Sequence, residues 1–211
     1  SIHNLVTVKT KAIICVHLAG WPCDLDDIVS LAKDFQLYVI EDCAQAHGAR
    51  YKGKSVGSIG HVGCWSFCQD KIMTTGGEGG MVTTNDKSTW EKMWAYKDHG
   101  KDYDAVYERE HGKGFRWVHE SFGTNWRMTE IQAVIGRIQL KRMPEWNTAR
   151  LANFRKIWNS ASQCKGLRVP HIPENIDHAA YKCYVFVKSD ELKRDWDRDR
   201  VLFEINKLGA P

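Results

Sequence analysis

The chain has 211 residues, of which 43% are hydrophobic and 27% are charged, and its formal net charge is +4. This composition is sufficient for one sizeable hydrophobic core, or for one core and part of a second domain. The charges are mixed in sign without a long Lys/Arg run, and the longest apolar run near the start is AIICV, so the sequence indicates no nucleic-acid binding, membrane span or signal sequence.

The first two-thirds of the chain alternate between strand and helix patterns. Asp24 is the expected N-cap of the first helix, and Leu25 and Ile28 begin its apolar face. This alternation is the βαβ order of an α/β protein with a mainly parallel sheet. The predicted strands are 12–17, 37–42, 62–67 and 80–84, and the predicted helices are 25–35 and 88–100.

Periodicity lapses over residues 101–123, a charged and aromatic segment with several glycines. A loop of that length inside a compact domain is usually functional or packed against a partner. Helical periodicity then returns: Thr129 and Gln132 form a capping box, and a second long helix is expected over 145–163.

After Gly166 the pattern changes to a predicted strand at 181–188 and a predicted helix at 197–209. We expect these residues to begin a smaller α+β domain. The predicted organisation is therefore a large domain over 1–143, a connecting helix over 144–165 and part of a small domain over 166–211.

Seven cysteines, an odd number, occur without a CxxC pair, and the histidines lack a helical metal-binding spacing. Neither a metal site nor a dithiol redox centre is predicted. A reduced, cytoplasmic setting fits these cysteines better than a disulfide framework does.

Two charged residues stand at or shortly after the ends of predicted strands. Lys71 lies between a strand and a cluster of four glycines, and Asp42 ends the strand 37–42. Each has an ordinary explanation, since single lysines are usually surface charges and Asp42 is equally consistent with a helix N-cap. Together they suit pyridoxal 5'-phosphate (PLP), whose aldehyde needs a lysine and whose ring nitrogen needs a carboxylate. The glycines match no nucleotide-binding loop.

Four strings carry a specific resemblance, in order, over essentially residues 10–209: VHLAGWPCDLDDI, VIEDCAQAHGARYKGKSVGSIGHVGCWSF, KIMTTGGEGGMVTTND and GTNWRMTEIQAVIGRIQL. They resemble the DegT/DnrJ/EryC1/StrS family of PLP-dependent aminotransferases, which act on nucleotide-linked keto-sugars. The resemblance implies the fold-type I aminotransferase architecture, a three-layer α/β fold with a mainly parallel sheet. It further implies a chain that is truncated at both ends, with only part of the small α+β domain.

The resemblance assigns a role to each of the two charged residues, Lys71 and Asp42. Lys71 matches the Schiff-base lysine, which also moves the proton between the substrate carbon and the cofactor. Asp42 matches the carboxylate that keeps the pyridine nitrogen protonated, so that the ring can accept electrons. The implied reaction transfers an amino group from glutamate or a similar donor to a keto-sugar nucleotide.

The resemblance implies further cofactor contacts. Gln45 matches a residue near the phenolic oxygen and the ring face of PLP, and Ser66 matches a phosphate ligand. Asn125 matches a residue that reaches the phosphate held by a neighbouring subunit, and Arg127 lies beside it. The protein is therefore expected to be a homodimer with shared active sites.

Some alternatives remain open at this point. A sugar dehydratase of the same family would carry histidine in place of Lys71, so Lys71 opposes that activity. A truncated chain that folds and dimerises without holding cofactor is the alternative from a non-enzymatic class. His47 follows Asp42 closely, and a structural role for it is about as plausible as contact with the cofactor.

Overall fold

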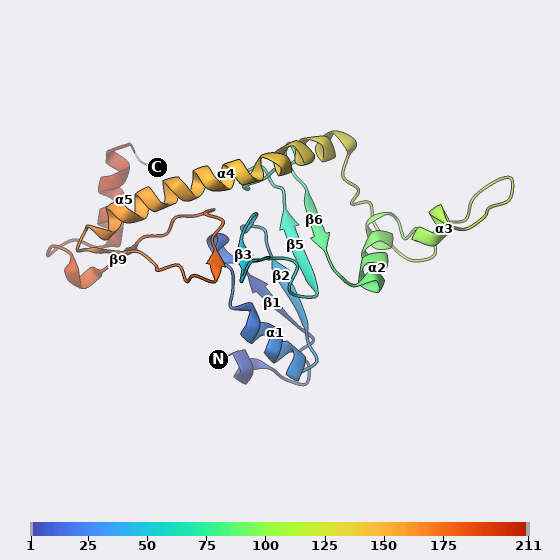
Figure 1. Cartoon of the computed structure of the whole chain (residues 1–211), viewed down its shortest axis with the longest axis horizontal. Helices are drawn as coiled ribbons and strands as arrows, with labels where there is room; N and C mark the ends of the chain where they lie inside the picture. The colour runs from blue at the N-terminus through green and yellow to red at the C-terminus, as the bar shows by residue number, and fades with distance from the viewer. Residues whose placement is uncertain (1, 210–211) are drawn as a thin grey trace.

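A computed structural model describes residues 2–209 and places a four-stranded sheet at the centre of the molecule (Figure 1). Its strands are β1 (Ala12–Val16), β2 (Tyr38–Asp42), β5 (Val62–Ser66) and β6 (Gly80–Thr83), in that spatial order. β1, β2 and β5 run parallel, and β6 is antiparallel to β5. The prediction of a mainly parallel α/β sheet is confirmed.

The other elements connect and flank this sheet. The helices are η1 (Ile2–Leu5), η2 (Leu18–Gly20), α1 (Leu25–Asp34), α2 (Lys87–Lys97), α3 (Tyr103–Tyr107), α4 (Glu130–Ser162), η3 (Ser189–Glu191) and α5 (Arg198–Lys207). The short strands are β3 (Arg50–Tyr51), β4 (Lys54–Ser55), β7 (Leu167–Arg168), β8 (Ile176–Asp177) and β9 (Phe186–Val187). Within the described residues, no helix is long and apolar enough to cross a membrane.

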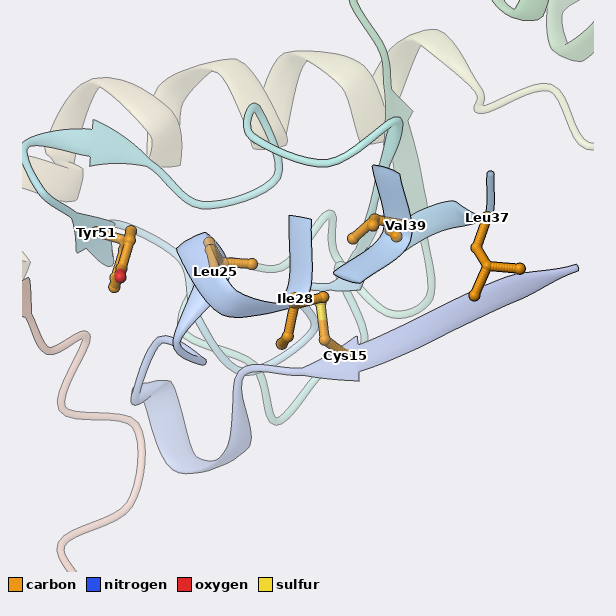
Figure 2. Packing of buried hydrophobic residues seen from close by; sticks show 7 residues of the cluster. Cys15, Leu25, Ile28, Leu37, Val39 and Tyr51 are labelled. Atoms are coloured by element: carbon orange, nitrogen blue, oxygen red, sulfur yellow. The ribbon is translucent and has the colours of Figure 1, made fainter. Parts of the chain in front are cut away.

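One face of the sheet is covered by α1. Side chains alternate along a strand, so one set of β1 and β2 residues packs under the helix. Figure 2 shows this cluster, which includes Cys15, Leu25, Ile28, Leu37, Val39 and Tyr51. Asp24 precedes α1 as expected but makes no capping bond through its side chain; its Oδ1 instead accepts a hydrogen bond from the Tyr51 hydroxyl at 2.6 Å.

The long helix α4 differs from the sequence expectation. Thr129 and Gln132 form the predicted capping box, but the helix continues through Pro144 as a single 33-residue element. Proline lacks the N–H that would bond to the carbonyl four residues earlier, at Leu140. Leu140 lies on the exposed side of the helix, and α4 continues past this missing bond without a break. Figure 1 shows α4 running from the segment after α3 past the sheet toward α5.

The predicted strand 181–188 is also shorter than expected, because only Phe186–Val187 pairs as a strand, with β7. The preceding segment bonds elsewhere: the Ala179 N–H donates to the Gly20 carbonyl at 2.9 Å, and the Lys182 N–H donates to the Ala19 carbonyl at 3.1 Å. Ala180 has a φ of 52°, which interrupts extended backbone.

A fully buried carboxylate, Glu41 of β2, joins three parts of the fold. It accepts hydrogen bonds from the backbone N–H groups of Gly57 at 2.7 Å, Ile59 at 2.9 Å and Gly60 at 2.6 Å. His17 Nε2 contributes a fourth bond, at 3.0 Å. Burial opposes ionisation, but these four donors outweigh it and hold the pKa of Glu41 below its ordinary value.

His17 is fixed from both sides of its ring. Nδ1 accepts from the Cys23 N–H at 3.0 Å, so Nε2 carries the ring proton and donates to Glu41. With Cys43, these two residues form a buried group whose potential ligand atoms lie within 4.8 Å of one another. The histidine nitrogens and the Glu41 oxygens are already engaged in hydrogen bonds, which identifies the group as structural rather than metal-binding.

Replacing Glu41 by Gln is expected to destabilise the protein by about 3 kcal/mol or more, because several buried donors lose a charged acceptor. The pKa of Glu41 is lowered by folding, so its contribution is complete above the unfolded pKa of about 4.3 and is lost as the pH falls through the lower folded value. Denaturant unfolding at several pH values should therefore show the gap between wild type and Glu41→Gln closing on acidification. A pH-independent gap would contradict this assignment.

Candidate functional site

Three candidate residues lie at or after the carboxyl ends of neighbouring parallel strands. β2 ends at Asp42 and its neighbour β5 ends at Ser66, and the chain leaves this edge through loops. Lys71 follows Ser66 in a turn closed by a 3.0 Å bond from its own N–H to the Cys68 carbonyl. Open α/β sheets bind ligands at this edge.

Lys71 is mostly enclosed, because its side chain is only 16% exposed. Its Nζ lies 4.0 Å from Asp70 Oδ1, which is beyond hydrogen-bond distance, and 5.3 Å from the centre of the Tyr181 ring. The amine is therefore restrained by its surroundings without being neutralised by a close ion pair.

Asp42 was interpreted from the sequence either as a cap or as a cofactor ligand, and its two carboxylate oxygens differ in their bonding. Its Oδ1 accepts from the Ala44 N–H at 3.0 Å, which closes a local turn in the manner of a cap. Among residues 2–209, its other carboxylate oxygen receives no hydrogen bond and remains available to a ligand.

Gln45 and Ser66 are oriented by backbone donors. The Ala19 N–H donates to Gln45 Oε1 at 2.6 Å, which leaves the amide NH₂ of Gln45 free to donate. The Cys68 N–H donates to Ser66 Oγ at 3.3 Å, which leaves the hydroxyl hydrogen free. Both side chains thus keep a donor for a ligand.

Asn125 and Arg127 lie in a different part of the molecule, on the segment that joins α3 to α4. Asn125 pairs with Asp98 at the end of α2. Arg127 Nε donates to Asn125 Oδ1 at 3.1 Å and lies 3.5 Å from Asp98 Oδ1. Both residues are exposed, so their assignment as cofactor ligands of a neighbouring subunit stays a prediction.

Asp98 anchors this second cluster. It is 8% exposed and accepts a bond from Lys101 Nζ at 3.2 Å, with His99 Nδ1 at 3.4 Å. Burial opposes ionisation of Asp98, but the hydrogen bonds from Lys101 and His99 and the charges of Lys101 and Arg127 lower its pKa. Three Lys or Arg residues thus surround a single carboxylate, namely Lys97, Lys101 and Arg127.

The glycines after Lys71 form a tight turn. Gly76 and Gly77 have φ values of 78° and 143°, a region that other residues resist. A Cβ at Gly79 would lie 2.2 Å from Thr75 Oγ1. The cluster therefore shapes the backbone that follows Lys71.

Tyr181 was not predicted from the sequence. It reaches Lys71 from 110 residues farther along the chain because the segment around it bonds to η2. No motif marks that contact, so sequence reasoning offered no signal for it.

The sequence matches the DegT/DnrJ/EryC1/StrS aminotransferase family over residues 1–208. The chain belongs to this family. It is 46% identical over 145 residues to the GDP-perosamine synthase of Escherichia coli O157:H7, an alignment that covers 69% of this chain and 37% of the relative. It is 36% identical over 190 residues to the dTDP-3-amino-3,6-dideoxy-alpha-D-galactopyranose transaminase of Aneurinibacillus thermoaerophilus, covering 88% of this chain and 47% of the relative.

Solved structures agree with this membership. An aminotransferase from Psychrobacter cryohalolentis superposes on the whole chain with a TM-score of 0.96 and 65% identity, over 55% of its own length. DesV from S. venezuelae, solved with a ketimine intermediate, superposes on the whole chain with a TM-score of 0.83 and 29% identity, over 51% of its length. The fold is that of fold-type I PLP-dependent aminotransferases, and the chain spans about half the length of the structures it matches.

The residues of this family member at the carboxyl edge fit PLP by their chemistry. Lys71 offers an amine for an aldehyde, and Asp42 keeps one oxygen free for a ring nitrogen. Ser66 and Gln45 keep donors for phosphate and phenolic oxygens. Buried His47, whose two ring nitrogens lack partners within residues 2–209, adds polar atoms that a ligand could satisfy.

Replacing Asp98 by Asn is expected to loosen residues 124–127. The substitution removes the charged carboxylate that Lys97, Lys101 and Arg127 surround. Hydrogen exchange should become at least several-fold faster at the amides of Thr124 and Trp126, which bond to Tyr96 and Lys97. Asp70→Asn is a matched control, since Asp70 is an exposed carboxylate near Lys71. Unchanged protection in Asp98→Asn would contradict the anchoring role.

Proposed function

We propose that the protein to which this chain belongs transfers an amino group from an amino-acid donor of the glutamate type to a nucleotide-linked keto-sugar. The observation that carries the proposal is the enclosed Lys71, which follows β5, the strand that pairs with β2 and its terminal Asp42, in a member of an aminotransferase family. Relatives named for amino-sugar nucleotides support this substrate class. The product would be an amino sugar for a surface polysaccharide or a secondary metabolite.

PLP supplies an aldehyde that binds amines and a ring that accepts electrons from the carbon undergoing reaction. Lys71 would hold the cofactor through Nζ and would carry a proton to and from the reacting substrate carbon at the same atom. Asp42 would keep a proton on the ring nitrogen through its free oxygen. Ser66 would donate to the phosphate and Gln45 to the phenolic oxygen.

Two alternatives are weaker. A sugar dehydratase of the family would carry histidine where Lys71 stands. A chain that folds without holding cofactor would have no use for an enclosed lysine, since a lysine is ordinarily placed in solvent. The placement of Lys71 therefore favours transamination over both.

The proposal also includes a cytoplasmic location and a homodimeric assembly. Seven free thiols support a reduced, cytoplasmic location. A homodimer with shared sites is supported by aromatic side chains that are exposed on residues 107–126, where Trp117 is 79% exposed and Phe122 is 98% exposed. A second copy would bury them and would receive Asn125 and Arg127 at its phosphate.

Replacing Lys71 by Ala should abolish both transamination and covalent attachment of PLP, because no other amine replaces Nζ. Borohydride reduction followed by mass spectrometry locates the attachment. Lys182→Ala is the matched control, because Lys182 Nζ lies 5.0 Å from the same Tyr181 ring but is exposed. Labelling that persists in Lys71→Ala and disappears in Lys182→Ala would overturn the assignment.

Replacing Asp42 by Asn should lower turnover by at least ~10²-fold, since a charge that stabilises the reacting centre is removed. An Asn oxygen can still accept from the Ala44 N–H, so the local turn should survive. Turnover with a keto-sugar nucleotide, compared with the melting temperature, separates the two effects. Near-normal turnover in a folded Asp42→Asn protein would count against the proposed role.

Replacing both Trp117 and Phe122 by Glu should shift the protein from dimer to monomer, weakening association by at least about tenfold. Leu208→Glu is the control, because Leu208 is 87% exposed but lies beyond α5. Sedimentation at micromolar concentration measures the outcome. A monomeric wild type, or dimers that survive the double substitution, would contradict the proposed interface.

A further inference from the structure

His47 lies in the turn that follows Asp42 and Gln45. It is 4% exposed, and its ring centre lies 5.3 Å from that of Trp65 and 5.9 Å from that of Phe67. These two aromatic residues flank Ser66 at the end of β5. The imidazole is therefore enclosed at the same edge of the sheet as the other candidate residues.

Neither ring nitrogen of His47 has a hydrogen-bond partner among the described residues. A neutral imidazole carries one donor and one acceptor, and each costs free energy when it is buried unpaired. Buried polar groups in native proteins are nearly always bonded, so an exception calls for an explanation.

The other two fully enclosed histidines have partners. His17 is bonded through both nitrogens. His178, which is 5% exposed, accepts from the Ala180 N–H through Nδ1 at 2.7 Å. Burial lowers the pKa of both His47 and His178 to about 4, so the two are neutral alike and differ in their bonding.

The surroundings of His47 point toward the site. Lys71 and Arg150 are the charged side chains that act on it, and both reinforce the lowering of its pKa. The Ser66 backbone acts in the opposite direction and favours the protonated ring, but it forms no hydrogen bond to either nitrogen of His47, and the aromatic rings beside it offer no acceptor. A ligand with lone pairs, placed next to Lys71, would supply what the ring lacks.

We infer that His47 is a ligand-contacting residue whose imidazole hydrogen-bonds to PLP held at Lys71, a role that rests on the proposed function. The unpaired nitrogens then represent a cost carried by the empty protein and relieved by the bound cofactor. Removing the imidazole should therefore stabilise the protein without PLP and weaken its affinity for PLP.

The test compares His47→Phe, His47→Gln and His178→Phe with wild type, measuring melting temperature without PLP and the affinity for PLP. His47→Phe removes two unpaired polar atoms and should raise the melting temperature of the empty protein by about 2–4 °C. Its affinity for PLP should fall by about two- to tenfold, the range for one neutral hydrogen bond. His47→Gln, which keeps a donor and an acceptor, should recover most of the affinity.

His178→Phe is the matched control for burial. It leaves the Ala180 N–H unpaired, so its melting temperature should fall. A comparable fall in His47→Phe, or an unchanged affinity for PLP in that variant, would overturn the inference and leave the proposed function intact. A wild type that captures no PLP at Lys71 would overturn both.

Discussion

A buried negative charge organises the part of the fold on which the site depends. Glu41 needs several donors to remain ionised without solvent, and it draws them from the turn before β5 and from the residue after β1. β1 and β2 are thereby joined near their carboxyl ends, and β2 is joined to the turn that leads into β5. Asp42 is the next residue along β2, so its position follows directly from where Glu41 is held.

The sequence predicted well whatever depends on local pattern. Strands, the first helix and the capping box at Thr129 could be recognised from periodicity and from single residue types. Asp42 and Lys71 could be recognised because strand ends in an α/β sheet share one edge. Family resemblance added roles for Gln45 and Ser66, whose remaining donors are consistent with those roles.

What escaped prediction depends on contacts between distant segments. The role of Glu41 could not be predicted, because its partners are mostly backbone N–H groups that no sequence pattern marks. α4 continues through Pro144, where helix propensity alone favours a break. For His47 the sequence left cofactor contact and a structural role about equally plausible, since an unpaired nitrogen is a property of the surrounding packing.

The backbone bonds from Ala179 and Lys182 to η2 impose an order on biosynthesis. Lys71 leaves the ribosome long before Tyr181, at about 5–20 residues per second. The Tyr181 ring therefore reaches the Lys71 amine only after residues near 182 have left the ribosome and formed their backbone bonds to η2. Until then the nascent chain presents Lys71 without the Tyr181 ring beside its amine.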